Sequence, residues 1–167
     1  MSKLKLSFAH HAASVENMER SIAWYSKLFD AEVYFDQHSS QFGAPLNCRV
    51  VIMRAGEVEF ELFEYQGKDW QPVPALSRDS TTDPRICGNK HDCFVVDDMR
   101  RFVMERVVPY HVHIDHGPER QGDNWQLFIT DPDGAQIELY DIGGAARDPH
   151  AFDHFPCKLF QETEEEA

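Results

Sequence analysis

The first part of the chain changes from strand-like to helix-like spacing of its apolar residues and back again. Residues 8–15 alternate as a short strand does, and residues 16–29 carry apolar side chains at helical spacing. Asn17 can cap this helix. The inward face of the helix is predicted to hold Met18, Ile22, Tyr25 and Phe29. Three strand-like runs follow, at residues 31–36, 46–56 and 57–65.

The second part of the chain repeats this order. Residues 90–96 predict a strand, and residues 97–107 predict a short helix with an Asp cap. The inward side chains of this helix are predicted to be Met99, Phe102 and Val103. Strand-like runs follow at residues 109–115, 125–130 and 135–141. The last two runs are joined by Asp-Pro-Asp-Gly at 131–134, with Pro and Gly where a type I turn prefers them.

This repeated order predicts an α+β fold made of two tandem βαβββ modules. We place the first module at residues 8–65 and the second at 86–142. The connector between them, 66–85, is rich in Pro, Ser and Thr, and a surface role is favoured over one in which Trp70 covers a cleft. Residues 143–167 form a C-terminal extension that ends in an acidic tail.

Two histidines occupy equivalent positions in the first strands of the modules. Side chains two residues apart in a strand share a face. His10 precedes Val15 by five positions and His91 precedes Val96 by five, and both valines mark the face under the helix. Both imidazoles are therefore predicted to point away from the helix. His11 is the alternative to His10 as the functional histidine of this strand.

The last strand of each module carries a carboxylate between two apolar residues that face the core. These carboxylates are Glu61 and Glu138, and Glu59 shares the predicted face of Glu61 and is its alternative. A carboxylate in the middle of a half-buried strand is costly without a cation or donor nearby. Imidazole and carboxylate groups suit first-row divalent ions. The two pairs of side chains therefore predict a metal site.

Other polar and aromatic residues are candidates for contacts with a substrate. His111 and His113 alternate with apolar residues and are expected to face a cleft, where contact with a substrate, or with nothing, is favoured over a second metal site. The candidates for recognising an anionic or aromatic substrate are Arg49, Arg120, Trp125 and Tyr140.

The overall composition narrows the classes of partner. The 167 residues include 16 basic and 29 acidic side chains, a net charge of −13. Nucleic acids and anionic membranes require a basic face, so neither is expected to bind. No apolar run approaches the roughly 20 residues that span a bilayer, and the N-terminus has no signal-peptide pattern, so we expect a cytoplasmic protein. The four scattered cysteines are expected to be thiols rather than disulfides.

Three segments resemble the vicinal oxygen chelate superfamily, which includes glyoxalase I, methylmalonyl-CoA epimerase, extradiol dioxygenases and bleomycin resistance proteins. They are HHAASVENMERSIAWYSKLF at 10–29, HDCFVVDD at 91–98 and DPDGAQIELYD at 131–141. The resemblance implies that the modules form an open, curved sheet barrel around a metal cleft. It also implies four metal ligands, by the match to glyoxalase- and epimerase-like members: His10, Glu61, His91 and Glu138.

The resemblance further implies a metal-dependent isomerase, epimerase or lyase of the glyoxalase type, which chelates adjacent oxygens of a small, oxygen-rich substrate and stabilises an enediolate or enolate. Glu138 or Glu61 is then the general base, and the ion is Ni, Co, Zn or Mn. One alternative is an Fe(II) extradiol-type ring-cleaving dioxygenase, although those enzymes carry a tyrosine where this chain has Phe128. Another is a non-catalytic small-molecule binding or resistance protein. A homodimer is expected, because open sheet edges favour association.

Overall fold

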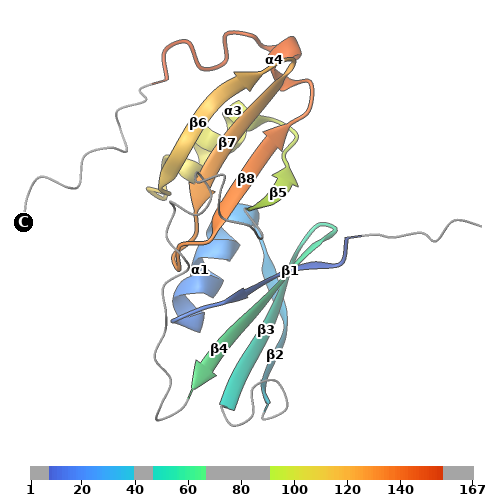
Figure 1. Ribbon diagram of the computed structural model, residues 1–167, viewed down its shortest axis with the longest axis vertical. Helices are drawn as coiled ribbons and strands as arrows, with labels where there is room; N and C mark the ends of the chain where they lie inside the picture. The colour runs from blue at the N-terminus through green and yellow to red at the C-terminus, as the bar shows by residue number, and fades with distance from the viewer. Residues whose placement is uncertain (1–7, 40–46, 67–90, 156–167) are drawn as a thin grey trace, which may run out of the picture. The chain divides into compact units, whose positions relative to one another are not determined.

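Residues 8–39, 47–66 and 91–155 are described by the computed structural model. The chain divides into two units, Met1–Val73 and Pro74–Ala167, and each contains a four-stranded sheet with its own helix or helices (Figure 1). The predicted connector at 66–85, apart from Gln66, lies outside the described residues, and so does the acidic tail.

The first unit has the predicted order of a strand, a helix and three strands. Its elements are β1 (His10–Ser14), α1 (Met18–Phe29), β2 (Glu32–Ser39), β3 (Asn47–Ala55) and β4 (Val58–Gln66). The strands lie in the order β1-β4-β3-β2, with β1 parallel to β4 and the other neighbours antiparallel. Because α1 packs against β3 and β4, one face of the sheet forms the core of this unit.

The second unit repeats this plan and adds a short C-terminal helix. Its elements are β5 (Asp92–Val95), α3 (Met99–Phe102), the π-helix η1 (Val103–Val107), β6 (Ile114–Gln121), β7 (Asn124–Thr130), β8 (Gln136–Asp141) and α4 (Gly144–Arg147). The strand order is β5-β8-β7-β6, with β5 parallel to β8. The matching topologies confirm the α+β class and the two βαβββ modules, while the predicted residue bounds of the modules stay predictions.

The helices begin at the residues that the sequence indicated. Asn17 Oδ1 accepts a hydrogen bond from the backbone N–H of Arg20 at 2.9 Å, and Asp98 Oδ1 accepts one from Arg101 at 2.9 Å. In α1 the residues buried completely are Met18, Ser21, Tyr25 and Leu28. The predicted Ile22 and Phe29 are half-buried at the edge of this face. None of the helices in the described ranges is long and apolar enough to cross a membrane.

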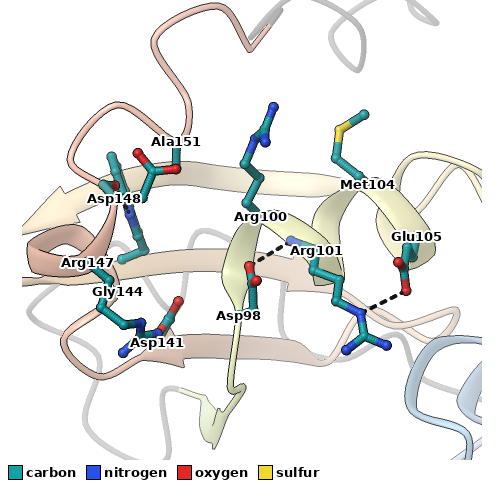
Figure 2. Close-up of a pocket in the computed structure, with 11 residues that line it drawn as sticks. Asp98, Arg100, Arg101, Met104, Glu105, Asp141, Gly144, Arg147, Asp148 and Ala151 are labelled. Atoms are coloured by element: carbon teal, nitrogen blue, oxygen red, sulfur yellow. Dashed lines mark hydrogen bonds and ion pairs between the residues drawn. The ribbon is translucent and has the colours of Figure 1, made fainter.

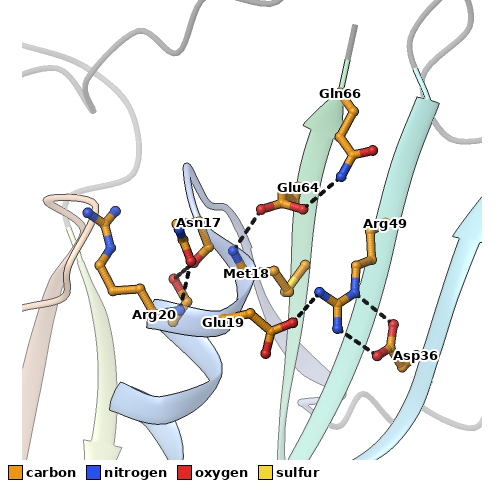
Figure 3. A network of polar contacts seen from close by, with 9 residues as sticks. Asn17, Met18, Glu19, Arg20, Asp36, Arg49, Glu64 and Gln66 are labelled. Carbon is orange, nitrogen blue, oxygen red and sulfur yellow. Dashed lines mark hydrogen bonds and ion pairs between the residues drawn. The ribbon is translucent and has the colours of Figure 1, made fainter.

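Each main helix also begins at a carboxylate from the last strand of its own unit. The backbone N–H of Met18 donates to Glu64 Oε1 at 2.9 Å (Figure 3). In the second unit the N–H of Met99 donates to Asp141 Oδ2 at 3.0 Å. Both carboxylates stand three residues after the candidate metal ligand of the same strand. The duplication therefore includes the junction of helix and sheet, which the pattern of apolar residues did not reveal.

The predicted strand at residues 109–115 is wrong for most of its length, because β6 begins only at Ile114. Val112 donates its N–H to the carbonyl of Val107 at 3.0 Å, so helical winding continues beyond η1. His111 adopts a left-handed conformation with φ of 51° in the turn that follows. The apolar alternation seen here reflects the end of a helix rather than a strand.

The other end of β6 extends further than predicted. The strand continues to Gln121 through Gly117 and Pro118, two residues that usually interrupt strands. A proline is tolerated because β6 is an edge strand, where one side of the backbone needs no hydrogen-bonded partner. Irregular pairing with β7 between residues 116 and 119 accommodates both residues.

Candidate metal centre

The first unit brings His10 and Glu61 together on the face of the sheet opposite α1. Nε2 of His10 lies 3.4 Å from Oε2 of Glu61, and their side chains are 48% and 20% exposed. The parallel register of β1 and β4 produces this contact, because Glu61 lies opposite Ala12, two residues along from His10. The imidazole and the carboxylate therefore share one partly shielded surface.

The alternatives in the first unit are engaged elsewhere. His11 is only 5% exposed and its ring contacts Phe60 in the core, with centroids 6.0 Å apart. Glu59 forms an ion pair with Arg54 at 2.5 Å, and hydrogen bonds from Arg54 and Tyr34 lower the pKa of Glu59. His10 and Glu61 are thus the better placed pair for holding an ion.

The second unit forms a matching pair from His91 and Glu138. Nε2 of His91 lies 3.0 Å from Oε2 of Glu138, and the side chains are 30% and 14% exposed. His91 directly precedes β5, and Glu138 lies in the middle of β8. The ring of Phe128 packs edge-on against His91, with centroids 5.1 Å apart. This apolar neighbour restricts the imidazole and shields one side of the pair.

Cys93 is a neighbour of this pair that the sequence analysis did not single out. It lies directly opposite Glu138 in the register of β5 and β8, and its thiol hydrogen-bonds the Glu138 carboxylate. Desolvation of the thiol, followed by the hydrogen bond and charge of Glu138, raises the pKa of Cys93 to about 12. Strand alternation could have found it, because His91 and Cys93 share one face.

Most of the residues considered for substrate recognition lie away from the face of Glu138 or are already engaged. Arg49 faces α1, where it pairs with Asp36 at 2.8 Å and with Glu19 at 2.6 Å (Figure 3). Trp125 is buried and donates to the carbonyl of Asp148 at 3.2 Å.

The other two candidates are Arg120 and Tyr140. Arg120 donates to the carbonyl of Gly122 at 2.7 Å. Tyr140 shares the face of Glu138, two residues away in β8, and its hydroxyl donates to Gln121 at 2.9 Å. Tyr140 is therefore the one of the four candidates that the structure places beside the second pair.

The two histidines of the mispredicted strand, His111 and His113, lie in different local surroundings. His111 lies in a turn, and Nε2 of His113 lies 3.3 Å from Asp115, whose other oxygen accepts the Thr130 hydroxyl. Within the described parts of the chain, no group of three or more His, Cys, Asp or Glu side chains lies close enough together to hold a metal ion. Each unit thus supplies two donors, one imidazole and one carboxylate.

A groove of about 430 Å³ lies elsewhere in the second unit, between α3, η1 and the segment around α4 (Figure 2). Its charged side chains largely pair with one another: Arg101 donates to Glu105 at 3.2 Å, and Arg147 donates to Asp141. The groove is lined by residues of the helix side of the sheet rather than by the face of Glu138. It has no part in the candidate metal centre.

The matching βαβββ units and their equivalent side chains agree with the comparison with known families. The model of the Glyoxalase/Bleomycin resistance protein/Dioxygenase superfamily matches residues 7–139. The chain belongs to this superfamily. No curated protein matches the sequence.

Solved structures share the fold of this superfamily member at low sequence identity. A glyoxalase family protein from Bacillus cereus is 14% identical, with a TM-score of 0.65 over 84% of this chain and 97% of that one. The trypanothione-dependent glyoxalase I of Leishmania major is 20% identical, with a TM-score of 0.58 over 88% and 94% of the two chains. The fosfomycin resistance protein FosX of Listeria monocytogenes, solved with Mn(II) and sulfate, is 14% identical, with a TM-score of 0.54 over 83% and 93%.

Proposed function

We propose that this protein is a glyoxalase-like, metal-dependent isomerase, epimerase or lyase, and that His10, Glu61, His91 and Glu138 together bind one divalent ion. The main support is that each unit presents a histidine and a glutamate at equivalent positions, with Nε2 and Oε2 3.4 Å apart in the first unit and 3.0 Å apart in the second. Two donors of one unit are too few for a stable site, whereas four donors match the needs of a first-row ion. The family relationship supports the same combination.

The chemistry of the donors restricts the ion. Two imidazoles and two carboxylates suit Ni²⁺, Co²⁺, Zn²⁺ or Mn²⁺, and four protein ligands leave positions for substrate oxygens in a five- or six-coordinate ion. When bound, such an ion supplies a Lewis acid that stabilises negative charge on adjacent oxygens of the substrate. A small molecule with neighbouring carbonyl and hydroxyl oxygens is the substrate class that fits.

The glutamates supply the proton transfer. Glu138 or Glu61 removes a proton from the carbon next to the substrate carbonyl. Either the same carboxylate then returns the proton to the neighbouring carbon, or the other glutamate protonates the opposite face of the first carbon. The first outcome is isomerisation and the second is epimerisation. Because each carboxylate lies against a histidine, its orientation toward the substrate is restricted before the reaction begins.

Ring cleavage has less support than this proton transfer. The face that carries His91 and Glu138 also carries Phe128, whose ring has no group able to give or accept a proton. An extradiol-type reaction would therefore need its acid and base from other residues.

The proposal is tested by the metal content of protein purified without added ions. We expect about one divalent ion per chain and a marked loss of metal in Glu61→Gln and Glu138→Gln. Glu59→Gln is the matched control, because Glu59 lies in the same strand but pairs with Arg54. Exchange of substrate hydrogen with D₂O, followed by mass spectrometry over a set of hydroxycarbonyl compounds, measures the proton transfer. The proposal would be refuted if Glu61→Gln and Glu138→Gln both kept the metal content and the hydrogen exchange of the wild type.

A further inference from the structure

The two halves of the candidate metal centre differ at the position opposite the glutamate. Residue 12 lies opposite Glu61 in the pairing of β1 with β4, and residue 93 lies opposite Glu138 in the pairing of β5 with β8. These positions are equivalent, because each lies two residues after the histidine of its unit. The first is alanine and the second is cysteine.

This difference gives the two carboxylates different numbers of polar neighbours. Glu138 contacts the imidazole of His91 and also accepts the hydrogen bond of the Cys93 thiol. Glu61 contacts His10, and it has no other polar partner among residues 8–39, 47–66 and 91–155. The glutamate with more polar neighbours is also the less exposed one: the side chain of Glu138 is 14% exposed and that of Glu61 is 20% exposed.

We propose that Cys93 is a positioning residue that donates its S–H hydrogen to Glu138 and holds this carboxylate in the orientation that binds the metal. The inference rests on the proposed function, since it takes Glu138 to be a ligand. A carboxylate has two oxygens and several lone pairs, so it can accept the thiol hydrogen and still present an oxygen to a cation. Glu61, opposite Ala12, keeps more rotational freedom.

The thiol acts through Glu138 and does not itself bind the ion. The register places Cys93 directly opposite Glu138, where its S–H group can donate to the carboxylate. Partners of metal ligands typically change metal affinity by roughly 10–100-fold. A thiol is a weak donor, so the loss of Cys93 is expected to fall at the lower end, about tenfold.

The test compares Co²⁺ affinity, measured by competition with a chelator, in four proteins: wild type, Cys93→Ala, Cys93→Ser and Ala12→Ser. We expect Cys93→Ala to bind Co²⁺ about tenfold more weakly and Cys93→Ser, which keeps a donor, to recover most of the loss. Ala12→Ser is the matched control, since it adds a donor opposite the other carboxylate and should not weaken binding. Thermal unfolding of each protein checks that the fold is intact.

Three results with Co²⁺ would overturn the inference. The first is wild-type affinity in Cys93→Ala, and the second is no recovery in a folded Cys93→Ser protein. The third is a near-ultraviolet charge-transfer band from thiolate to Co²⁺ that disappears in Cys93→Ser, because the sulfur would then be a ligand rather than a hydrogen-bond donor.

A measurement without metal separates this inference from the proposed function. The Raman S–H stretching band that Cys93→Ser removes should move to higher frequency in Glu138→Ala, because the thiol loses its acceptor. If the band shifts in Glu138→Ala but the wild-type protein binds no Co²⁺, the metal centre is refuted. The contact between the thiol and the carboxylate is then still supported. An unshifted band would refute the positioning role.

Discussion

The Nε2 atom of His91 lies 3.0 Å from Oε2 of Glu138, on the face of the second sheet opposite the one against which α3 packs. Glu138 lies in β8 and His91 directly precedes β5, the parallel neighbour of β8, so the pairing of these two strands sets the spacing of the pair. His10 and Glu61 repeat the arrangement in the first unit. A site built on strands holds its ligands more precisely than one built on loops.

His91→Ala should lower the affinity for Co²⁺ by more than about 100-fold, because loss of a ligand exceeds the roughly 10–100-fold effect of an outer partner. Competition with a chelator measures the affinity. His116→Ala is the control, since His116 belongs to the same unit but lies 2.8 Å from Glu119. Equal affinities in His91→Ala and the control would exclude His91 as a ligand.

Asp141→Ala should lower the free energy of unfolding by about 1–3 kcal/mol, because it leaves the N–H of Met99 without its acceptor in a buried place. Asp141 is 3% exposed and also accepts from Arg147. Urea unfolding measures the change, with the exposed Asp153→Ala as the control. A change below about 0.5 kcal/mol, as for ordinary surface substitutions, would show that α3 does not depend on this carboxylate.

Gly144→Ala should also destabilise the protein, by about 1–3 kcal/mol through overpacking. A Cβ atom at this position would overlap the carboxylate of Asp141. If that clash is the cause, the double variant Asp141→Ala/Gly144→Ala should lose less stability than the sum of the two single variants. Additive losses in urea unfolding would point to a different cause.

Asp36→Asn should make stability less sensitive to acid. Hydrogen bonds from Arg49 lower the pKa of Asp36 in the folded protein. The resulting stabilisation is present above the ordinary carboxyl pKa of about 3.9 and is lost as pH falls through the lowered value. The side chain of Asp36 is 40% exposed, so the effect is about 1 kcal/mol or less.

Urea unfolding at pH 7 and pH 3 measures this effect. The difference in stability between the two pH values should be smaller in Asp36→Asn than in the wild type, and Arg49→Ala should reduce it similarly. An unchanged difference in both variants would show that the pair contributes nothing to acid sensitivity.

Alternation in the sequence was sufficient to choose between neighbouring residues where one face of a strand is buried. His10 and His11 differ by one position, and the burial of His11 follows from the apolar residues that share its face. The same rule fails in β3, where Val50 and Val51 are both buried and no polar face is visible. For this reason the side of the sheet on which Arg49 lies was not predictable.

Local pattern was also insufficient where backbone hydrogen bonds decide the structure. The alternation around Val112 is equally compatible with a strand and with the last turn of a helix, and the bond to Val107 decides for the latter. The contact between Cys93 and Glu138 depends on the pairing of strands 45 positions apart in the sequence, which no single strand reveals.

The register of β5 with β8 determines both which side chains of β8 carry the carboxylate face and which fill the core. If β8 slipped by a single residue against its neighbours, Glu138 would turn into the interior and Leu139 would turn toward water. Such a molecule would lose its core at the same time as its ligands. Every chain that reaches this fold therefore has the Glu138 carboxylate next to the His91 imidazole.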